Sequence, residues 1–176
     1  MPRDPGTASE PSQGSSETRV GIGYDSHRFD RSRPLILGGV KIDGYPGLLG
    51  HSDGDAVCHA VTDAILGAAG AGDIGGMFPD DKEANRGRDS VEMLSLAAKE
   101  IAKRGRRVSH VDVVVITEEP KIGPHRAAMQ KRLAAALGID ASEVSVKGKS
   151  NEGMGWIGRG EGLACMAVAT LARAKS

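Results

Sequence analysis

Aromatic residues are scarce in this 176-residue chain, which contains one Trp, two Tyr and two Phe. Apolar residues still make up 39% of the chain, so we expect a core built from Val, Ile, Leu, Ala and Met. The length is typical of one domain and is sufficient to bury such a core. No internal repeat is visible in the sequence.

Net charge is also absent, because 23 Lys and Arg residues balance 23 Asp and Glu residues. A balanced charge provides no global field for nucleic acid or an acidic membrane, so we predict neither as a partner. No apolar stretch approaches the roughly 20 residues of a membrane span, and the N-terminus lacks a secretion signal. We therefore expect a soluble, cytoplasmic protein. Its two cysteines, Cys58 and Cys165, form no Cys-x-x-Cys pattern and are expected to be buried thiols.

Glycine, by contrast, is abundant, with 25 residues in the chain. This is roughly twice the usual share and indicates many turns or close approaches of the backbone. Residues 1–18 combine Pro, Gly, Ser, Thr and Glu with almost no large apolar side chains, so we predict a disordered N-terminal tail. The acids Asp4, Glu10 and Glu17 argue against a transit peptide there. Residues 19–176 are then expected to form a single domain.

Strand and helix signals alternate along this domain. Short strands are predicted at 19–24, at 34–42 as one or two pieces broken by Gly38-Gly39, and at 144–148. A further strand at 111–117 is so apolar that both of its faces should be covered. Helices are predicted at 54–69, 90–103 and 124–138, whereas the glycine-rich segment 70–88 is predicted to be a long functional loop. The run 163–172 suits either a strand or a helix. The alternation predicts an α+β sandwich, with a mixed sheet and helices packed on one face.

Histidines and carboxylates group in two segments. Asp25 and His27 are two residues apart on an extended chain, so their side chains project the same way. The segment His51-Ser52-Asp53-Gly54-Asp55 leads into the predicted helix, where Asp55, His59 and Asp63 are spaced by four and should form one polar stripe. His and carboxylate ligands suit zinc or a similar ion, and three of them leave a position open for catalysis. Spacing alone leaves His51 and His59 as equal candidates for the third ligand.

Two further segments could bind phosphate. The loop from Gly72 to Asp81 combines glycines with carboxylates, and the segment Lys147-Gly148-Lys149-Ser150-Asn151-Glu152 is typical of an anion pocket beside an acid that could hold a cation. Each pattern is equally typical of a solvated charged loop. Gly21-x-Gly23 lacks the third glycine of a dinucleotide fingerprint. The chain has no P-loop and no Gly-x-Ser-x-Gly nucleophile turn.

Four blocks taken in order resemble a known family. They are Gly-Tyr-Asp-Ser-His-Arg-Phe, Leu-Leu-Gly-His-Ser-Asp-Gly-Asp-Ala-Val-Cys-His-Ala, Gly-Asp-Ile-Gly-Gly-Met-Phe-Pro-Asp and Gly-Arg-Gly-Glu-Gly-Leu-Ala-Cys. Together they resemble the 2-C-methyl-D-erythritol 2,4-cyclodiphosphate synthases over nearly all of residues 19–173. The resemblance implies the conversion of 4-diphosphocytidyl-2-C-methyl-D-erythritol 2-phosphate to the cyclodiphosphate and CMP. It makes the enzyme a metal-dependent phosphorus–oxygen lyase of non-mevalonate isoprenoid synthesis.

The resemblance also implies site residues. It gives Asp25, His27 and His59 as ligands of one Zn²⁺ per subunit, and Glu152 as a ligand of Mg²⁺ or Mn²⁺ on the substrate diphosphate. It gives His51 and Ser150 catalytic roles and implies substrate contacts in the metal site, the 72–82 loop and the 117–123 and 149–152 segments. These contacts are Ser52, Asp73, Ile74, Gly75, Phe78, Pro79, Asp80, Lys121, Lys149, Ser150, Asn151, Glu152, Trp156 and Arg159.

The implied assembly is a homotrimer with active sites between subunits, in which 163–172 is a strand. Its central cavity could take an isoprenoid diphosphate near Tyr24, Trp156 and Arg159. The chain departs from the family pattern at Lys82, where the family usually has Asp, and at Lys149 to Asn151, where a run of Thr is common. Two other hypotheses are a metal-dependent phosphohydrolase that uses the same residues and a non-catalytic sensor that keeps the fold.

Overall fold

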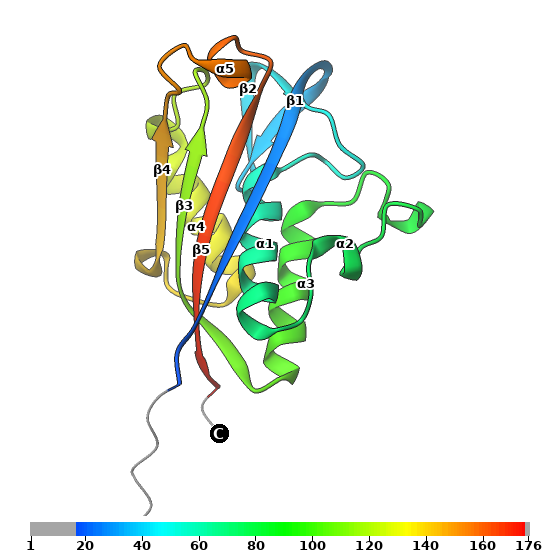
Figure 1. Ribbon diagram of the computed structural model, residues 1–176, viewed down its shortest axis with the longest axis vertical. Helices are drawn as coiled ribbons and strands as arrows, with labels where there is room; N and C mark the ends of the chain where they lie inside the picture. Colours follow the sequence, from blue (N-terminus) through cyan, green and yellow to red (C-terminus); the bar gives the residue numbers. More distant parts are fainter. Residues whose placement is uncertain (1–16, 175–176) are drawn as a thin grey trace, which may run out of the picture.

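The computed structural model describes residues 17–174 as one five-stranded mixed sheet with helices on one face (Figure 1). The strand order is β2-β1-β5-β3-β4, and only the β3–β4 pair is parallel. The strands are β1 (Arg19–Leu37), β2 (Val40–Leu48), β3 (Arg106–Ile116), β4 (Val144–Lys149) and β5 (Gly162–Arg173). The predicted α+β class is confirmed, and the ambiguous run 163–172 is a strand at the centre of the sheet.

The first strand is much longer than the predicted 19–24. Residues 19–28 of β1 pair with β5, and its second half pairs with β2 through the Gly38-Gly39 turn. The two glycines have φ of 57° and 71°, which is the left-handed backbone that a two-residue hairpin turn requires. The pairing of β1 with β2 shifts register between Asp30 and Leu35. That irregularity, together with the polar run before Pro34, removes the alternation by which the strand could have been predicted.

Three helices cover one face of the sheet. They are α1 (Ala56–Ala69), α3 (Ser90–Lys103) and α4 (Arg126–Leu137). The predicted bounds of α3 are confirmed at both ends, and Asp89 caps it by accepting hydrogen bonds from the N–H groups of Val91 and Glu92. Pro124 lies in a short 3-10 turn, Gly123–His125, before α4 begins. The predicted loop 70–88 contains the one-turn helix α2 (Ile74–Met77) and a 3-10 turn, Glu83–Asn85, and another one-turn helix, α5 (Gly155–Gly158), precedes β5.

Glycine lets β1 and α1 approach to backbone contact. A Cβ at Gly23 would lie 1.9 Å from the carbonyl oxygen of Ala60, and one at Gly21 would lie 2.1 Å from that of Ala64. The Gly21-x-Gly23 pair therefore serves packing. Because side chains alternate along a strand, Asp25 and His27 continue the same face and also point toward α1.

The other face of the sheet is open in the single chain. Val20, Ile22 and Tyr24 of β1 and Met166 and Val168 of β5 are each 40% or more exposed. In β3, Val111, Val113 and Val115 are buried, whereas the side chains between them are only half-buried. The prediction that both faces of 111–117 are covered is therefore wrong for this chain alone.

Most of the predicted disordered tail, residues 1–16, lies outside the described residues. Glu17, which was assigned to that tail, forms ion pairs with Arg19, Arg106 and Arg173 at 3.0–3.2 Å, so the prediction of disorder is wrong for this residue. A sequence pattern could not show this, because two of the arginines come from distant strands. Within residues 17–174, no helix is both long enough and apolar enough to cross a membrane.

Candidate metal centre and substrate cavity

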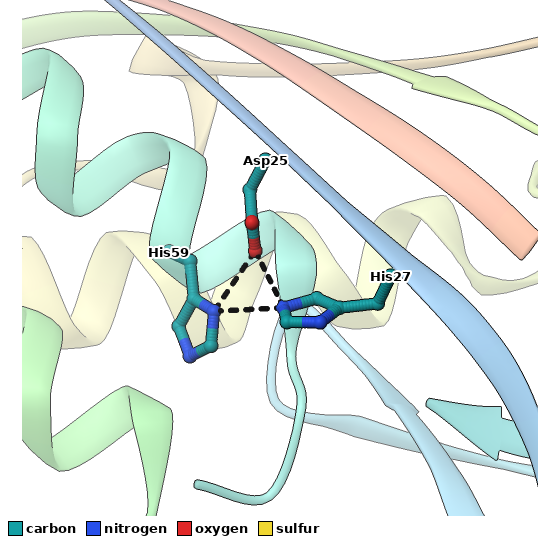
Figure 2. A group of neighbouring side chains, drawn as sticks. All are labelled: Asp25, His27 and His59. Atoms are coloured by element: carbon teal, nitrogen blue, oxygen red, sulfur yellow. Dashed lines mark hydrogen bonds and ion pairs between the residues drawn. The ribbon is translucent and has the colours of Figure 1, made fainter. Parts of the chain in front are cut away.

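Asp25, His27 and His59 converge on one point (Figure 2). The first two extend from β1, and His59 extends from the first turn of α1, which packs against that strand. Asp25 Oδ2 lies 2.9 Å from His27 Nε2 and 2.9 Å from His59 Nδ1. The two histidine nitrogens are 3.3 Å apart. Within the described residues, these three side chains make up the one group of His, Cys, Asp and Glu whose donor atoms are close enough to share a metal ion.

The spacing of these atoms fits a small divalent ion. In a tetrahedral zinc site with bonds of about 2.0–2.1 Å, two ligand atoms lie about 3.3 Å apart. The histidine pair already has that separation, and the two distances from Asp25 are those of hydrogen bonds that an ion would replace. Two imidazoles and one carboxylate also match the donor set of open zinc sites. The residues present therefore fit zinc.

Charge in this group is set by its partners. Burial would raise the pKa of Asp25, but hydrogen bonds from His27 and His59 outweigh it and hold that pKa well below its usual range. Burial would lower the pKa of His59, yet the hydrogen bond and charge of Asp25 raise it. The carboxylate is therefore ionised and ready to accept a cation. Cys58 and Cys165 are confirmed as buried thiols, and burial raises the pKa of both.

The predicted polar stripe of Asp55, His59 and Asp63 is wrong for Asp55. This residue is fully buried at the N-cap of α1, where its carboxylate accepts hydrogen bonds from four backbone N–H groups. Two of these groups belong to the Gly38-Gly39 turn, so one side chain joins the β1–β2 hairpin to the helix that carries His59. Helical spacing did not predict this role because Asp55 precedes the first helical residue.

A cavity of about 620 Å³ opens beside the three candidate ligands, and we call it the metal cavity. Its lining comes from β1, the loop after β2, α1, the loop that contains α2, and α3. The lining residues are His27, Leu49, Gly50, His51, Ser52, His59, Ile74, Gly75, Phe78, Asp80, Asn85 and Met93. The sequence-predicted residues His51, Ser52, Ile74, Gly75, Phe78 and Asp80 are thus brought together with the candidate ligands.

The choice between His51 and His59 follows from their positions. The side chain of His51 is 64% exposed, and its Nε2 lies 3.9 Å from Asp80 Oδ2 across the mouth of the metal cavity. Arg33 holds the loop on both sides of His51, because its guanidinium donates to the carbonyl oxygens of Gly50 and Ser52. His51 is thus held at the rim of the cavity, outside the candidate ligand group.

In the loop that contains α2, Asp73 shapes the metal cavity through hydrogen bonds within the loop and does not line the cavity itself. Asp73 caps α2 by accepting a hydrogen bond from the N–H of Gly76 at 2.7 Å, and the N–H of Ile74 donates to Asp63 at 2.8 Å. These bonds orient Ile74 and Gly75 toward the metal cavity, whereas Asp73 and Pro79 only flank it. Phe78 is buried, and the guanidinium of Arg88 lies over its ring, with Cζ 5.3 Å from the ring centre.

The predicted lysine residues lie in a second, separate pocket of about 170 Å³, which we call the lysine pocket. Its lining includes Lys121, Lys149 and Ser150, together with Thr117, Pro120, Ile122, Gly123, Arg126 and Gly148. No residue lines both this pocket and the metal cavity. The two pockets of one chain are therefore lined by different residues.

The turn after β4 is organised by an acid that sequence reasoning did not single out. Glu118 Oε1 accepts hydrogen bonds from the N–H groups of Asn151 and Gly153. Glu152, the predicted ligand of a second ion, has a positive φ of 52° and accepts a hydrogen bond of 2.6 Å from Ser150. It lies outside the candidate ligand group of the metal cavity.

Trp156 belongs to α5 and Arg159 directly follows it, just before β5, which is one of the two strands of the open face described above. Trp156 lines a separate pocket of about 410 Å³ with Ser26, His27, Arg28 and Glu161. Arg159 Nε lies 2.6 Å from Glu161 Oε1, so an anion would have to compete with this ion pair. Tyr24 is 54% exposed on the same open face.

Sequence reasoning also missed residues behind the candidate ligands. His59 Nε2, the nitrogen that faces away from Asp25, lies 2.9 Å from the hydroxyl oxygens of both Ser52 and Ser90. Ser90 is in turn bonded to Asp53. The position of Asp53 inside the His-Ser-Asp-Gly-Asp motif was the available signal, but nothing local links it to Ser90, which is 37 residues away.

Comparison with known proteins defines the family. The model of the YgbB family matches residues 18–172. The chain belongs to this family. A family protein of Gemmatimonas aurantiaca, named 2-C-methyl-D-erythritol 2,4-cyclodiphosphate synthase, is 62% identical over 153 residues, which cover 87% of this chain and 92% of that protein. A protein of the same name from Erwinia tasmaniensis is 52% identical over 156 residues, which cover 89% of this chain and 99% of that protein.

Solved structures share the fold. The bifunctional IspDF of Campylobacter jejuni superposes with a TM-score of 0.87 at 40% identity, covering 90% of this chain and 43% of that longer protein. The CDP complex of IspF from Plasmodium falciparum gives a TM-score of 0.79 at 38% identity, and the match covers 92% of this chain and 100% of that protein. The first of these family folds is one part of a longer chain, and the second was captured with a cytidine nucleotide.

Proposed function

We propose that this chain is a 2-C-methyl-D-erythritol 2,4-cyclodiphosphate synthase. It would convert 4-diphosphocytidyl-2-C-methyl-D-erythritol 2-phosphate to the 2,4-cyclodiphosphate and release CMP, as a metal-dependent phosphorus–oxygen lyase. The observation that carries the proposal is the convergence of Asp25, His27 and His59 beside a cavity of about 620 Å³. Relatives of that name, one of them 62% identical over 87% of the chain, support the substrate.

The residues of the metal cavity have a positioning role in this reaction. Zn²⁺ held by Asp25, His27 and His59 would withdraw charge from the substrate diphosphate. The 2-phosphate of the substrate is itself the nucleophile, which accounts for the absence of a Ser or Cys nucleophile turn. The enzyme must therefore fold the substrate so that attack on the β-phosphorus is in line with the departing CMP. His51 and Ser52 sit at the cavity, where they can contact the anionic groups.

The loop over the cavity would hold the rest of the substrate. Gly75 and Asp73 are assigned to the ribose, and Phe78, Pro79 and Asp80 to the methylerythritol phosphate, with Ile74 lining the wall between them. In support, Ile74, Gly75, Phe78 and Asp80 all line the metal cavity. Lys82 lies beyond these residues and is exposed, so its departure from the family pattern leaves the cavity lining unchanged.

The lysine pocket would hold the cytosine and the diphosphate of the substrate. Lys121 and Lys149 supply positive charge there, and Ser150 supplies a hydroxyl donor. Asn151 and Glu152 follow in the turn that Glu118 organises, where Glu152 would ligate Mg²⁺ or Mn²⁺ on the diphosphate. Bound CDP in the related Plasmodium falciparum structure supports a cytidine nucleotide as the ligand.

The proposed assembly is a homotrimer, in which the metal cavity of one subunit meets the lysine pocket of its neighbour. The separation of these two pockets within one chain supports a site shared between subunits. The open apolar face of β1 and β5 supplies a surface that such an assembly would cover. Tyr24, Trp156 and Arg159 would then line the central cavity, where Arg159 could bind an isoprenoid diphosphate by exchanging its ion pair with Glu161. The cytoplasmic location stays a prediction from the sequence.

The test is product analysis with the synthetic diphosphocytidyl 2-phosphate substrate, Zn²⁺ and Mg²⁺. We expect stoichiometric CMP and a cyclic diphosphate, identified by ³¹P NMR, with no label incorporated from ¹⁸O-water. A linear product that carries ¹⁸O would identify a phosphohydrolase using the same residues. Binding of CDP without any turnover at high enzyme concentration would identify a non-catalytic sensor.

A further inference from the structure

A hydrogen-bonded chain of three side chains runs behind the metal centre. His59 turns Nδ1 toward Asp25 and His27, and its Nε2 lies 2.9 Å from Ser90 Oγ. Ser90 is fully buried at the start of α3. Asp53 accepts two hydrogen bonds from Ser90, one from its backbone N–H at 3.1 Å and one from its hydroxyl group.

The protons in this chain can be assigned from donor and acceptor chemistry. An ionised carboxylate only accepts hydrogen bonds, so the single hydroxyl proton of Ser90 is directed to Asp53. The oxygen of Ser90 can then only accept a bond from His59, which requires a proton on Nε2. Nδ1 donates to Asp25 Oδ2 in the metal-free chain and would exchange that proton for an ion at the point shared with Asp25 Oδ2 and His27 Nε2.

We propose that Ser90 and Asp53 are positioning residues for His59, which fix the imidazole tautomer and ring orientation that a metal ion requires. A metal-bound histidine commonly donates its other N–H to an acceptor, and loss of that acceptor costs about 10- to 100-fold in metal affinity. This inference rests on the metal site of the proposed function, but it assigns new roles to two residues that touch neither metal nor substrate.

Ser52 offers the alternative arrangement. Its hydroxyl oxygen lies 2.9 Å from His59 Nε2 and accepts a hydrogen bond from the N–H of Gly54, so its own proton is free. If that proton went to Nε2, the imidazole proton would sit on Nδ1 and point at Asp25. The contact of 3.2 Å between Ser52 and Ser90 provides another destination for it, with Ser90 accepting. The first arrangement places a proton on His59 Nε2 and the second leaves that nitrogen without one, and the two predict different sensitive serines.

Zinc affinity of the metal-free full-length chain, measured by competition with a chromophoric chelator, separates them. Ser90→Ala and Asp53→Asn should each weaken Zn²⁺ binding by about 10- to 100-fold, and Ser52→Ala should weaken it less. Ser95→Ala is the matched control, because Ser95 lies on the same helix and bonds only to the carbonyl of Val91. Its affinity should equal that of the wild type. Circular dichroism and thermal unfolding establish that each variant is folded.

Histidine ¹⁵N NMR of the metal-free wild type tests this arrangement without any substitution, and it should find a proton on His59 Nε2. An Nε2 without a proton, unchanged zinc affinity in Ser90→Ala, or a larger loss in Ser52→Ala would each overturn the inference. A wild-type protein that binds no zinc would instead reject the metal site of the proposed function. The two failures are therefore distinguishable.

Discussion

Asp55→Asn tests how the site is anchored to the fold. The Asp55 carboxylate is fully buried and lies between the β1–β2 turn and the N-terminus of α1. Oδ1 accepts hydrogen bonds from the N–H groups of Gly38, Val57 and Cys58 at 2.8–3.1 Å. Oδ2 accepts one from Gly39 at 2.6 Å. An asparagine can present its oxygen to the first three groups, but its NH₂ group then faces the N–H of Gly39.

The magnitude follows from this mismatch. Losing one hydrogen bond to a charged acceptor costs about 1.5–3 kcal/mol, and leaving a donor unsatisfied adds about 1–3 kcal/mol. The three remaining bonds also become bonds to a neutral acceptor. We therefore expect Asp55→Asn to lower the free energy of unfolding by about 3–5 kcal/mol, a large part of the about 5–15 kcal/mol of a typical domain.

Urea unfolding followed by far-UV circular dichroism at one fixed protein concentration measures this loss, because an oligomer's stability depends on concentration. Asp89→Asn is the matched control. Asp89 is an exposed N-cap of α3, a position where Asn caps as well as Asp. The free energy of unfolding of Asp89→Asn should therefore stay within about 1 kcal/mol of the wild-type value. A loss below about 1 kcal/mol for Asp55→Asn, equal to that of the control, would refute the anchoring role.

Two other substitutions follow from the same geometry. His59→Ala should abolish stoichiometric zinc in elemental analysis while His51→Ala retains it, because only His59 belongs to the ligand group; the reverse would show that His51 is the ligand. Gly23→Ala should destabilise the protein by about 3 kcal/mol or more, since its Cβ would meet the Ala60 carbonyl at 1.9 Å and backbone must move. Gly67→Ala, on the exposed side of α1, is the control, because a Cβ at Gly67 would have no atom within 4 Å. It should raise the free energy of unfolding by about 0.5–1 kcal/mol in the same assay. Equal effects of the two substitutions would contradict the packing argument.

The helices were predictable because their signals are local. α3 begins and ends where the capping residue Asp89 and the period of its apolar positions predict. The full length of β1 was not predictable, because its second half pairs with β2 across an irregular register. The sequence of residues 25–33 has no periodicity that would indicate this pairing. The central position of β5 likewise depends on pairing with both β1 and β3.

The sequence by itself determined which residue types could bind a metal: Asp25 and His27 share one face of a strand, and either His51 or His59 could join them. It also determined, through four motif blocks, the family to which the chain belongs. Only the tertiary structure decided between the two histidines, because the contact of α1 with β1 brings His59 to Asp25 and leaves His51 at the cavity rim. It also linked Asp53 and Ser90 to His59, since residues distant in sequence meet only when the helices pack.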